Sequence, residues 1–567
     1  MTATSLLLFI LFIQLIHFLG TWKLYVAAGR KAWEAAIPVY NGIVLMKIIN
    51  RPTWWIFFLF VPVINLFLFP IIWIETLRTF GKKTTADMVL GVATLGLYIA
   101  YVNYTQKVEY HADRELKAPN KTMDTIGSLS FAIMVATLVH TYFIQPYTIP
   151  TSSLEKSLLV GDFLFVSKFH YGARTPMTPI AAPMVHDTLP LINVKSYSKK
   201  PQLPYFRFPK IQEIKNNDIV VFNWPTDTVR FFRDPNSIDI RKPIDKKSNY
   251  VKRCLGIPGD SLQIKNGVVY INNKPLEIKD RQKTQRFYTL NTKQGQYLGS
   301  IVEDYKITEY RQLYEMQTAL WENDLVKNYF KENPKFELIE YAKDSLKTTL
   351  VGNINQATFD KFKMGTSATI LNINATEELI AKMKTDSRIE VIKNYLDLPS
   401  TALFPHSKPT WSTDNFGPIY IPQEGKTVAI NAKTLPFYKM IITEYEGNTV
   451  EENGNEIKIN GDVATTYTFK QDYYWMMGDN RHNSEDSRYW GYVPANHIVG
   501  KPIFIWMSID GINDGITKWK PRWERFFTTV DGQGQPQSYF KYFLILLGLY
   551  YVGDYFWKKK KKANSEE

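Results

Sequence analysis

The chain has very little cysteine and no motif that would build a histidine-dependent protease site. Cys254 is the one cysteine among 567 residues, which excludes an internal disulfide and a metal cluster made of cysteines. The eight histidines lie in no arrangement typical of a serine–histidine triad. No nucleic-acid motif is visible, although the formal net charge is +14. Because several lysines and arginines flank apolar runs, this charge indicates contact with a membrane surface rather than with nucleic acid.

The start of the chain also lacks the positive charges of a cleavable signal peptide. Residues 1–5 contain no lysine or arginine before the apolar run at residues 6–20, so we interpret this run as a retained membrane helix. Four later apolar runs are further candidates for membrane spans. They cover residues 54–74, 88–102, 126–144 and 539–557. The first of these contains Pro62 and Pro70, which imply a kink or a re-entrant turn.

Lysines and arginines in the short loops set the expected orientation, because such residues gather on the cytoplasmic side. If all five spans cross, basic clusters at residues 23–51, 107–121 and 558–562 share that side. A loop with three positive charges at residues 78–83 then lies outside, which is the weakest point of this arrangement. Residues 147–525 are therefore expected to be extracytoplasmic, in a multi-pass protein of the inner (cell) membrane.

The water-facing portion has the pattern of an all-β body. Short alternating strands recur, for example at residues 218–222 and 502–506. Two more strands flank Asn266 and Gly267, the dipeptide that most strongly indicates a hairpin.

Residues 277–415 differ from this body and are interpreted as a mixed α/β insertion with no visible chemistry. Residues 309–331 and 374–396 are predicted to be helical, the second with Asn374 and Glu377 placed as a capping box.

The expected organisation has seven parts, in chain order. They are an N-terminal multi-span membrane region (1–123), a transmembrane helix (124–146), the first part of a catalytic β domain (147–276), the insertion (277–415), the second part of the β domain (416–525), a C-terminal transmembrane helix (536–557) and a basic cytoplasmic tail (558–567).

Three segments gather hydroxyl, basic and acidic side chains at short spacing. Just after the apolar run 126–144, Pro150 is followed by the hydroxyls of Thr151, Ser152 and Ser153 in backbone that we expect to be extended.

The second segment, residues 249–260, reads as a strand that carries Lys252 and Arg253 on opposite faces, so one of these bases must point at an apolar layer. A lysine held there loses hydration, so its pKa falls and it can act as a general base. The third segment, residues 475–494, packs acids, arginines, serines and asparagines beside Trp and Tyr, a density typical of a buried hydrogen-bonded network.

Together these segments resemble the conserved boxes of bacterial type I signal peptidases, membrane-bound serine proteases that remove signal peptides. The first is similar to the family's Pro-Ser-x-Ser-Met-x-Pro-Thr-Leu, the second to Tyr-x-Lys-Arg-x-x-Gly-x-Pro-Gly-Asp, and the third to Gly-Asp-Asn-Arg-x-Asn-Ser-x-Asp-Ser-Arg. Residues 217–222 correspond to a further box. The resemblance covers roughly residues 125–275 and 415–510 and implies a mainly β catalytic domain of the signal-peptidase antiparallel fold, tethered by several transmembrane helices.

The resemblance also implies the roles of the site residues. Ser153 is expected to be the nucleophile and Lys252 the general base. Thr151 corresponds to an oxyanion-hole hydroxyl that acts with the backbone N–H of Ser153, and Ser484 to the serine that hydrogen-bonds the base. Two supporting ion pairs are implied, Asp486 with Arg488 and Asp479 with Arg253. No metal or organic cofactor is implied, and the expected partners are precursor proteins with signal peptides and the lipid bilayer.

The chain departs from the family pattern at six positions, none of which removes a reacting group. They are Thr151 for serine, Leu154 for methionine, Lys156 and Ser157 for Pro-Thr, Asn217 for glycine and His482 for aspartate. Leu154 keeps an apolar group that we expect to anchor near the bilayer. These departures bear on rate and substrate preference rather than on the reaction.

Two other functions are consistent with a groove of this kind. A catalytically silent membrane scaffold or chaperone would use the same groove, but it would have no reason to keep Ser153, Lys252 and Ser484 together. A serine–lysine hydrolase that cleaves itself or a soluble regulator is disfavoured by the five apolar runs and by a nucleophile close to the membrane.

Overall fold

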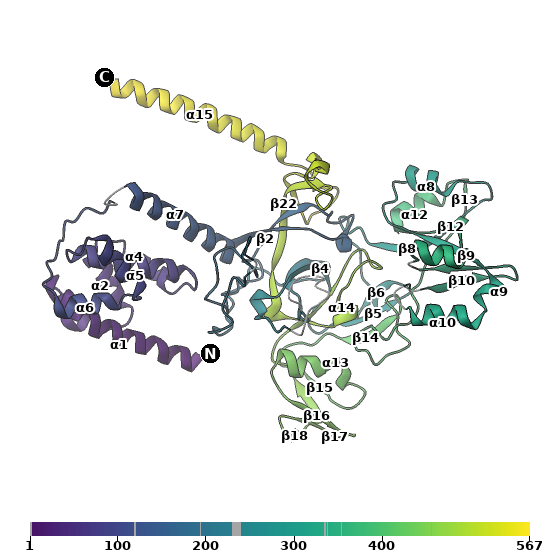
Figure 1. Ribbon diagram of the computed structural model, residues 1–567, viewed down its shortest axis with the longest axis horizontal. Coiled ribbons are helices and arrows are strands. Elements are labelled where there is room, and N and C mark those ends of the chain that lie inside the picture. Colours follow the sequence, from purple (N-terminus) through teal and green to yellow (C-terminus); the bar gives the residue numbers. More distant parts are fainter. Residues whose placement is uncertain are drawn as a thin grey trace.

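The computed structural model describes residues 3–117, 121–192, 194–228, 240–333, 336, 338–352, 354–454 and 456–566. Figure 1 shows a helical N-terminal part at one end, a β body in the centre and a second β sheet with helices at the far end. A long C-terminal helix projects away from the β body.

The N-terminal part is a cluster of mostly short helices around its own apolar core. They are α1 (Ala3–Ala27), α2 (Tyr40–Ile48), α3 (Trp55–Leu59), α4 (Ile64–Thr79), α5 (Thr85–Ala93) and α6 (Leu97–Thr105). The predicted run 54–74 is broken between α3 and α4, next to Pro62, as the prolines indicated. The run 88–102 is not one helix either, because the backbone turns at Gly96, whose φ is +85°.

Among the described residues, two helices are long and apolar enough to cross a membrane, by length and composition alone. These are Thr4–Ala27, within α1, and Lys121–Phe143, which joins α7 (Lys121–Leu138) to a π-helical turn, Val139–Phe143. The predicted C-terminal span forms one long helix, α15 (Phe540–Glu566), but it carries Lys541, Asp554 and a run of lysines and is not one of the two. The expectation of several spans therefore stays a prediction.

The central body is mainly antiparallel, as predicted, and is built on a nine-stranded sheet in the order β1-β2-β22-β3-β4-β20-β21, with β23 and β24 also paired to β22. Its strands are β1 (Ile144–Thr148), β2 (Asp162–Ser167), β3 (Ile219–Asn223), β4 (Asn249–Gly256), β20 (Tyr473–Met477), β21 (Val493–Pro494), β22 (Ile498–Asp510), β23 (Lys520–Pro521) and β24 (Thr528–Thr529). Successive side chains point to opposite faces of a strand, so β3 supplies Val221 to one apolar cluster and Val220 to another. The sheet is therefore buried on both faces at β3.

Smaller sheets extend this body. The predicted hairpin is confirmed: β5 (Ser261–Lys265) pairs with β6 (Val268–Ile271), and Asn266 and Gly267 both have positive φ. The remaining strands are β7 (Lys274–Pro275), β14 (Phe416–Tyr420), β15 (Thr427–Ala429), β16 (Val450–Asn453), β17 (Glu456–Ile459), β18 (Asp462–Val463) and β19 (Thr466–Thr468), and the helices are α13 (Leu435–Met440) and α14 (Ser487–Trp490).

The predicted insertion contains a six-stranded sheet in the order β10-β11-β9-β12-β8-β13. Its strands are β8 (Gln285–Thr292), β9 (Tyr310–Gln317), β10 (Ile339–Lys343), β11 (Lys347–Val351), β12 (Gly365–Thr376) and β13 (Ile389–Asn394), and its helices are α8 (Leu298–Asp304), α9 (Thr318–Trp321), α10 (Asp324–Glu332), α11 (Gln356–Lys361) and α12 (Glu377–Met383).

Both helix predictions in the insertion are partly wrong. The first half of 309–331 is strand β9, which pairs with β11 and β12, so sheet pairing overrides its local helical preference. In 374–396, Asn374 belongs to β12, and α12 is capped instead by Thr376, whose side chain accepts a hydrogen bond from the backbone N–H of Leu379. The predicted capping box does not form.

Candidate active site

The structure brings Ser153 and Lys252 into direct contact, although they lie 99 positions apart in the chain. Ser153 sits in a 3₁₀ turn, Ser152–Leu154, between β1 and β2, just beyond the end of α7. Lys252 is on β4, in the middle of the central sheet. Lys252 Nζ lies 2.6 Å from Ser153 Oγ, and the two residues are only 3% and 8% exposed.

The backbone around Ser153 is extended only as far as Thr151, where φ is −134° and ψ is 157°. The prediction of an extended run through Ser153 is therefore wrong, because Ser152–Leu154 closes a tight turn. Thr151 occupies the N-cap position of this turn, but its side chain accepts no capping hydrogen bond. The Thr151 hydroxyl is therefore not engaged in capping the turn.

Burial changes the acid–base behaviour of Lys252. The loss of hydration lowers the pKa of Lys252 to about 8, and the positive charge of Arg488 acts in the same direction. The carboxylates of Asp486 and Glu485 oppose this shift without cancelling it. Lys252 therefore has a substantial neutral fraction near pH 8, where an ordinary lysine is almost fully charged.

Asp479 and Arg253 form the first expected ion pair. Arg253 donates through Nε and Nη2 to the two oxygens of Asp479, at 2.7 and 2.6 Å, and both residues are buried. Burial opposes ionisation of Asp479, but Arg253 outweighs it and the pKa of Asp479 lies below its ordinary value. The hydroxyl of Ser157 also donates to Asp479, at 2.6 Å. The pair thus ties strand β4 to the segment that follows Ser153.

Asp486 and Arg488 form the second expected ion pair, directly beside the base. Arg488 donates through Nε and Nη2 to Asp486 at 2.9 and 2.8 Å, and the backbone N–H of Gly478 donates to Asp486 at 3.0 Å. Both members of the pair are at most 1% exposed. Such a bidentate pair holds the chain around Ser484 in one geometry.

Ser484 does not make the expected hydrogen bond to Lys252. Its Oγ is buried and has no hydrogen-bond partner among the described residues. Instead Ser484 packs against Gly478, where an added Cβ would lie only 2.3 Å from Ser484 Oγ and 2.6 Å from the carbonyl oxygen of Ser153. Gly478 is therefore required by close packing of three chain segments.

The predicted insertion reaches this site, which the sequence reasoning missed. One carboxylate oxygen of Glu309 accepts from Asn480 Nδ2 at 2.9 Å, and the other accepts from Asn483 Nδ2 at 3.2 Å. Asn480 Nδ2 also donates to the carbonyl oxygen of Ser152. Asn483 Nδ2 donates to the hydroxyl oxygen of Ser152. A carboxylate from outside the β body thus braces the turn that carries Ser153. No sequence signal pointed to Glu309, because it lies 171 positions from Asn480.

The structure also accounts for the surroundings of two further departures from the family pattern, Asn217 and Leu154. Asn217 has a φ of 72°, a left-handed conformation that glycine adopts freely and that asparagine adopts more readily than most other residues. Leu154 is 1% exposed and packs with Ile149, Leu158 and Leu164, so the expectation that it anchors near the bilayer is wrong.

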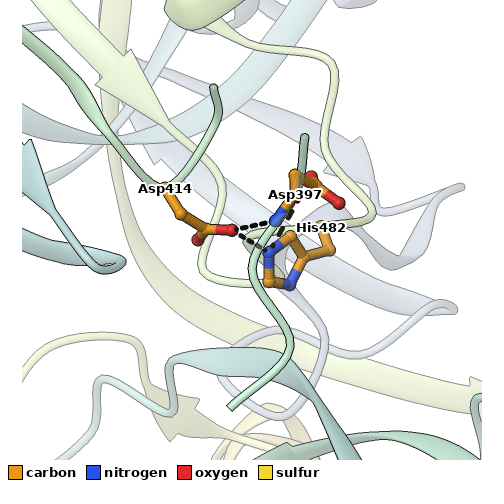
Figure 2. A group of neighbouring side chains, drawn as sticks. All are labelled: Asp397, Asp414 and His482. Carbon is orange, nitrogen blue, oxygen red and sulfur yellow. Dashed lines mark hydrogen bonds and ion pairs between the residues drawn. The ribbon is translucent and has the colours of Figure 1, made fainter. Parts of the chain in front are cut away.

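His482 lies with Asp397 and Asp414 in a group whose ligand atoms are close enough to hold a metal ion (Figure 2). The backbone N–H of Phe287 donates to Nδ1 of His482 at 2.9 Å, so the proton of a neutral imidazole is on Nε2. Nε2 is 2.9 Å from Asp414 and 3.8 Å from Asp397. Because the lone pair that a metal would need on Nε2 is replaced by this proton, the group fits a hydrogen-bonded clamp and does not fit a metal site.

Comparison with known proteins gives matches over the same segments. A family model described as "Signal peptidase, peptidase S26" matches residues 122–320 and 420–507, about half of the chain. A separate family of unknown function, DUF5684, matches residues 33–113 in the N-terminal helical part.

Similar curated proteins carry the name signal peptidase I. One from Buchnera aphidicola is 23% identical over 407 residues, covering 71% of this chain and 81% of that protein. One from Rickettsia felis is 29% identical over 151 residues, and one from Rickettsia prowazekii is 28% identical over 159 residues. These last two alignments span less than half of the Rickettsia proteins, 43% and 47%. The chain therefore belongs to the signal peptidase family, peptidase S26, and is a serine endopeptidase.

Proposed function

We propose that the chain removes N-terminal signal peptides from exported precursor proteins at a membrane, with Ser153 as nucleophile and Lys252 as general base. The observation that carries this proposal is the 2.6 Å approach of Ser153 Oγ to a buried lysine whose pKa is lowered to about 8. A serine hydroxyl is a weak nucleophile unless a neighbouring base takes its proton. The position of Lys252 beside Ser153 supports this role, which needs no histidine.

The reaction follows from this geometry. Neutral Lys252 accepts the proton of Ser153 Oγ as that oxygen attacks the scissile carbonyl, and the protonated amine then gives the proton to the departing peptide nitrogen. This leaves an acyl-enzyme on Ser153. Water, deprotonated by Lys252, hydrolyses the ester and restores both groups. The hydroxyl of Thr151, which makes no capping hydrogen bond in the turn, and the backbone N–H of Ser153 are proposed donors to the oxyanion.

Several neighbours are proposed to keep the pair aligned. The Asp486–Arg488 pair fixes the loop beside Lys252, and the Asp479–Arg253 pair fixes the segment after Ser153. Ser484 is proposed to contact Lys252 when the base changes protonation state or when substrate is bound. The residues before Ser153 are proposed to line a groove in which the precursor adds as an extended strand.

The membrane arrangement is part of the proposal. Two candidate spans, within α1 and at α7, support anchoring, and α7 ends a few residues before β1. A cut beside the membrane fits a substrate whose signal segment is still embedded in it. The β body and the insertion, residues 147–525, are proposed to face the extracytoplasmic side.

The test uses purified full-length protein in detergent and a precursor that carries a signal peptide. Mass spectrometry of the products should show one cut at the end of the signal peptide. Ser153→Ala and Lys252→Ala should each abolish this cut, while Lys265→Ala, an exposed strand lysine, should leave it unchanged. Near-normal cleavage by either dyad variant would show that the nucleophile or base is misassigned. A wild-type protein that binds the precursor without cutting it would instead favour a scaffold.

A further inference from the structure

A second site is suggested by a cavity of about 160 Å³ that lies between the end of α7 and the central sheet. Its lining includes Thr137, His140 and Thr141 from the end of α7 and its π-helical turn, and Gln145 and Tyr147 from β1. Neither Ser153 nor Lys252 lines it. The cavity is smaller than the roughly 300–1,000 Å³ typical of pockets for organic ligands, so it suits a small ionic group.

The cavity is lined by more positive than negative charge. Lys168, Arg174 and Lys246 contribute three cations, and Asp245 contributes the one carboxylate among its lining residues. Both oxygens of Asp245 are already engaged, by the backbone N–H and the hydroxyl of Thr178, at 2.9 and 2.7 Å. Within the described part of the chain, none of the three basic side chains forms an ion pair with Asp245.

The contacts of each cation support this conclusion. Among the described residues, Arg174 donates to neutral oxygens, the carbonyl of Asn496 at 2.6 Å and the side chain of Asn223 at 2.8 Å. Lys246 is 8% exposed, and among the described residues its Nζ has no hydrogen-bond acceptor, only the face of Tyr197 at 5.2 Å. Lys168 likewise has no carboxylate within ion-pairing distance in the described part of the structure.

Holding these charges without a counter-ion is costly. Burial, with a smaller contribution from Arg174, lowers the pKa of Lys168 to about 7. Burial also lowers the pKa of Lys246, against the attraction of Asp245 and Asp187. A buried cation is normally paired, so a bound anion would remove this cost.

We propose that this cavity binds the phosphate group of a membrane phospholipid. Arginine and lysine together are the usual protein partners of phosphate, through fork-like and point-charge contacts respectively. A lipid is favoured over a soluble phosphate because the cavity is lined by the end of α7, where, in the proposed arrangement, that helix leaves the bilayer. The lipid would hold the β body at a fixed height above the membrane. The choice of a lipid as the molecule that carries the phosphate rests on the proposed membrane arrangement. The proposal that the cavity binds a phosphate group does not.

The experiment measures binding rather than cleavage, so it can fail independently of the proposed peptidase activity. Delipidated full-length protein in detergent is titrated with short-chain phosphatidylglycerol, with short-chain diacylglycerol as the neutral lipid, and with inorganic phosphate. Binding is followed by native mass spectrometry and by the shift of Tm. The variant is Lys168→Gln combined with Lys246→Gln, and the matched control is Lys265→Gln on the exposed hairpin.

Wild type and control should bind phosphatidylglycerol at least tenfold more tightly than the double variant, and diacylglycerol should not bind. Without ligand, the double variant should be folded and at least as stable as wild type, because its substitutions remove two basic groups that have no ion-pair partner among the described residues. Equally tight binding of inorganic phosphate would keep the phosphate site but overturn the lipid as its source. Equal binding of phosphatidylglycerol by wild type and double variant would overturn the site.

Discussion

The protonation of Lys252 should control how activity depends on pH. If only the neutral amine can accept the proton of Ser153, kcat/KM follows the neutral fraction of Lys252 in the free enzyme. With a pKa of about 8, this fraction is about one tenth at pH 7, one half at pH 8 and nine tenths at pH 9. The expected gain between pH 7 and pH 9 is therefore about tenfold, with a plateau above pH 9. A lysine with an ordinary pKa near ~10.4 would instead give a gain of about a hundredfold, without a plateau.

A single substitution at Glu485 should shift the pH dependence of kcat/KM to lower pH, which the loss of a merely structural contact would not do. Glu485 is exposed and raises the pKa of Lys252 by its negative charge. Glu485→Gln should lower the apparent pKa, so that activity at pH 7 rises while activity at pH 9 stays the same. Glu451→Gln, on exposed strand β16, is the matched control and should leave the profile unchanged.

The assay is initial-rate cleavage of a fluorogenic signal-peptide substrate in detergent, at constant ionic strength from pH 6 to pH 10. A hundredfold rise between pH 7 and pH 9 in wild type would refute the lowered pKa of the base. An unshifted profile in Glu485→Gln would refute the electrostatic link between this carboxylate and Lys252.

Further variants test the surroundings of the dyad. Thr151→Val keeps the shape of the side chain but deletes the hydroxyl, so kcat should fall roughly a hundred- to a thousandfold with little change in KM or Tm. Thr151→Ser should stay active. A lower Tm with normal kcat in Thr151→Val would mean that the hydroxyl has a structural role. Glu309→Ala should lower kcat about tenfold while Tm changes little, because the substitution loosens the turn that carries the nucleophile. Unchanged kinetics would show that Glu309 does not help to position this turn. Lys252→Met should abolish cleavage yet raise stability at pH 7 by about 3 kcal/mol, because the folded state no longer holds a lysine with a pKa of about 8. The stabilisation should be full below pH 8 and vanish as the pH approaches the ordinary lysine pKa, which denaturant titrations at pH 7 and pH 10.5 can check. Protease added to intact spheroplasts should cut within residues 147–525, and protection of this portion would reverse the proposed orientation.

The sequence by itself determined the parts of the site that depend on residue type and local spacing. The segments around Ser153, Lys252 and Asp486 were recognisable because a serine nucleophile, a buried base and a bidentate ion pair need particular side chains in a fixed local order. The hairpin at Asn266 was equally predictable, since its turn depends on two adjacent residues with positive φ.

Only the tertiary structure decided the features that depend on neighbours distant in the chain. Residues 310–317 became a strand because two other strands pair with them, and Leu154 turned inward because an apolar cluster surrounds it. The brace from Glu309 to Asn480 and the clamp between His482 and Asp414 join the insertion to the catalytic loop. Such contacts leave no periodic pattern in the sequence, because hydrogen bonds and charge pairs are set by distance in space.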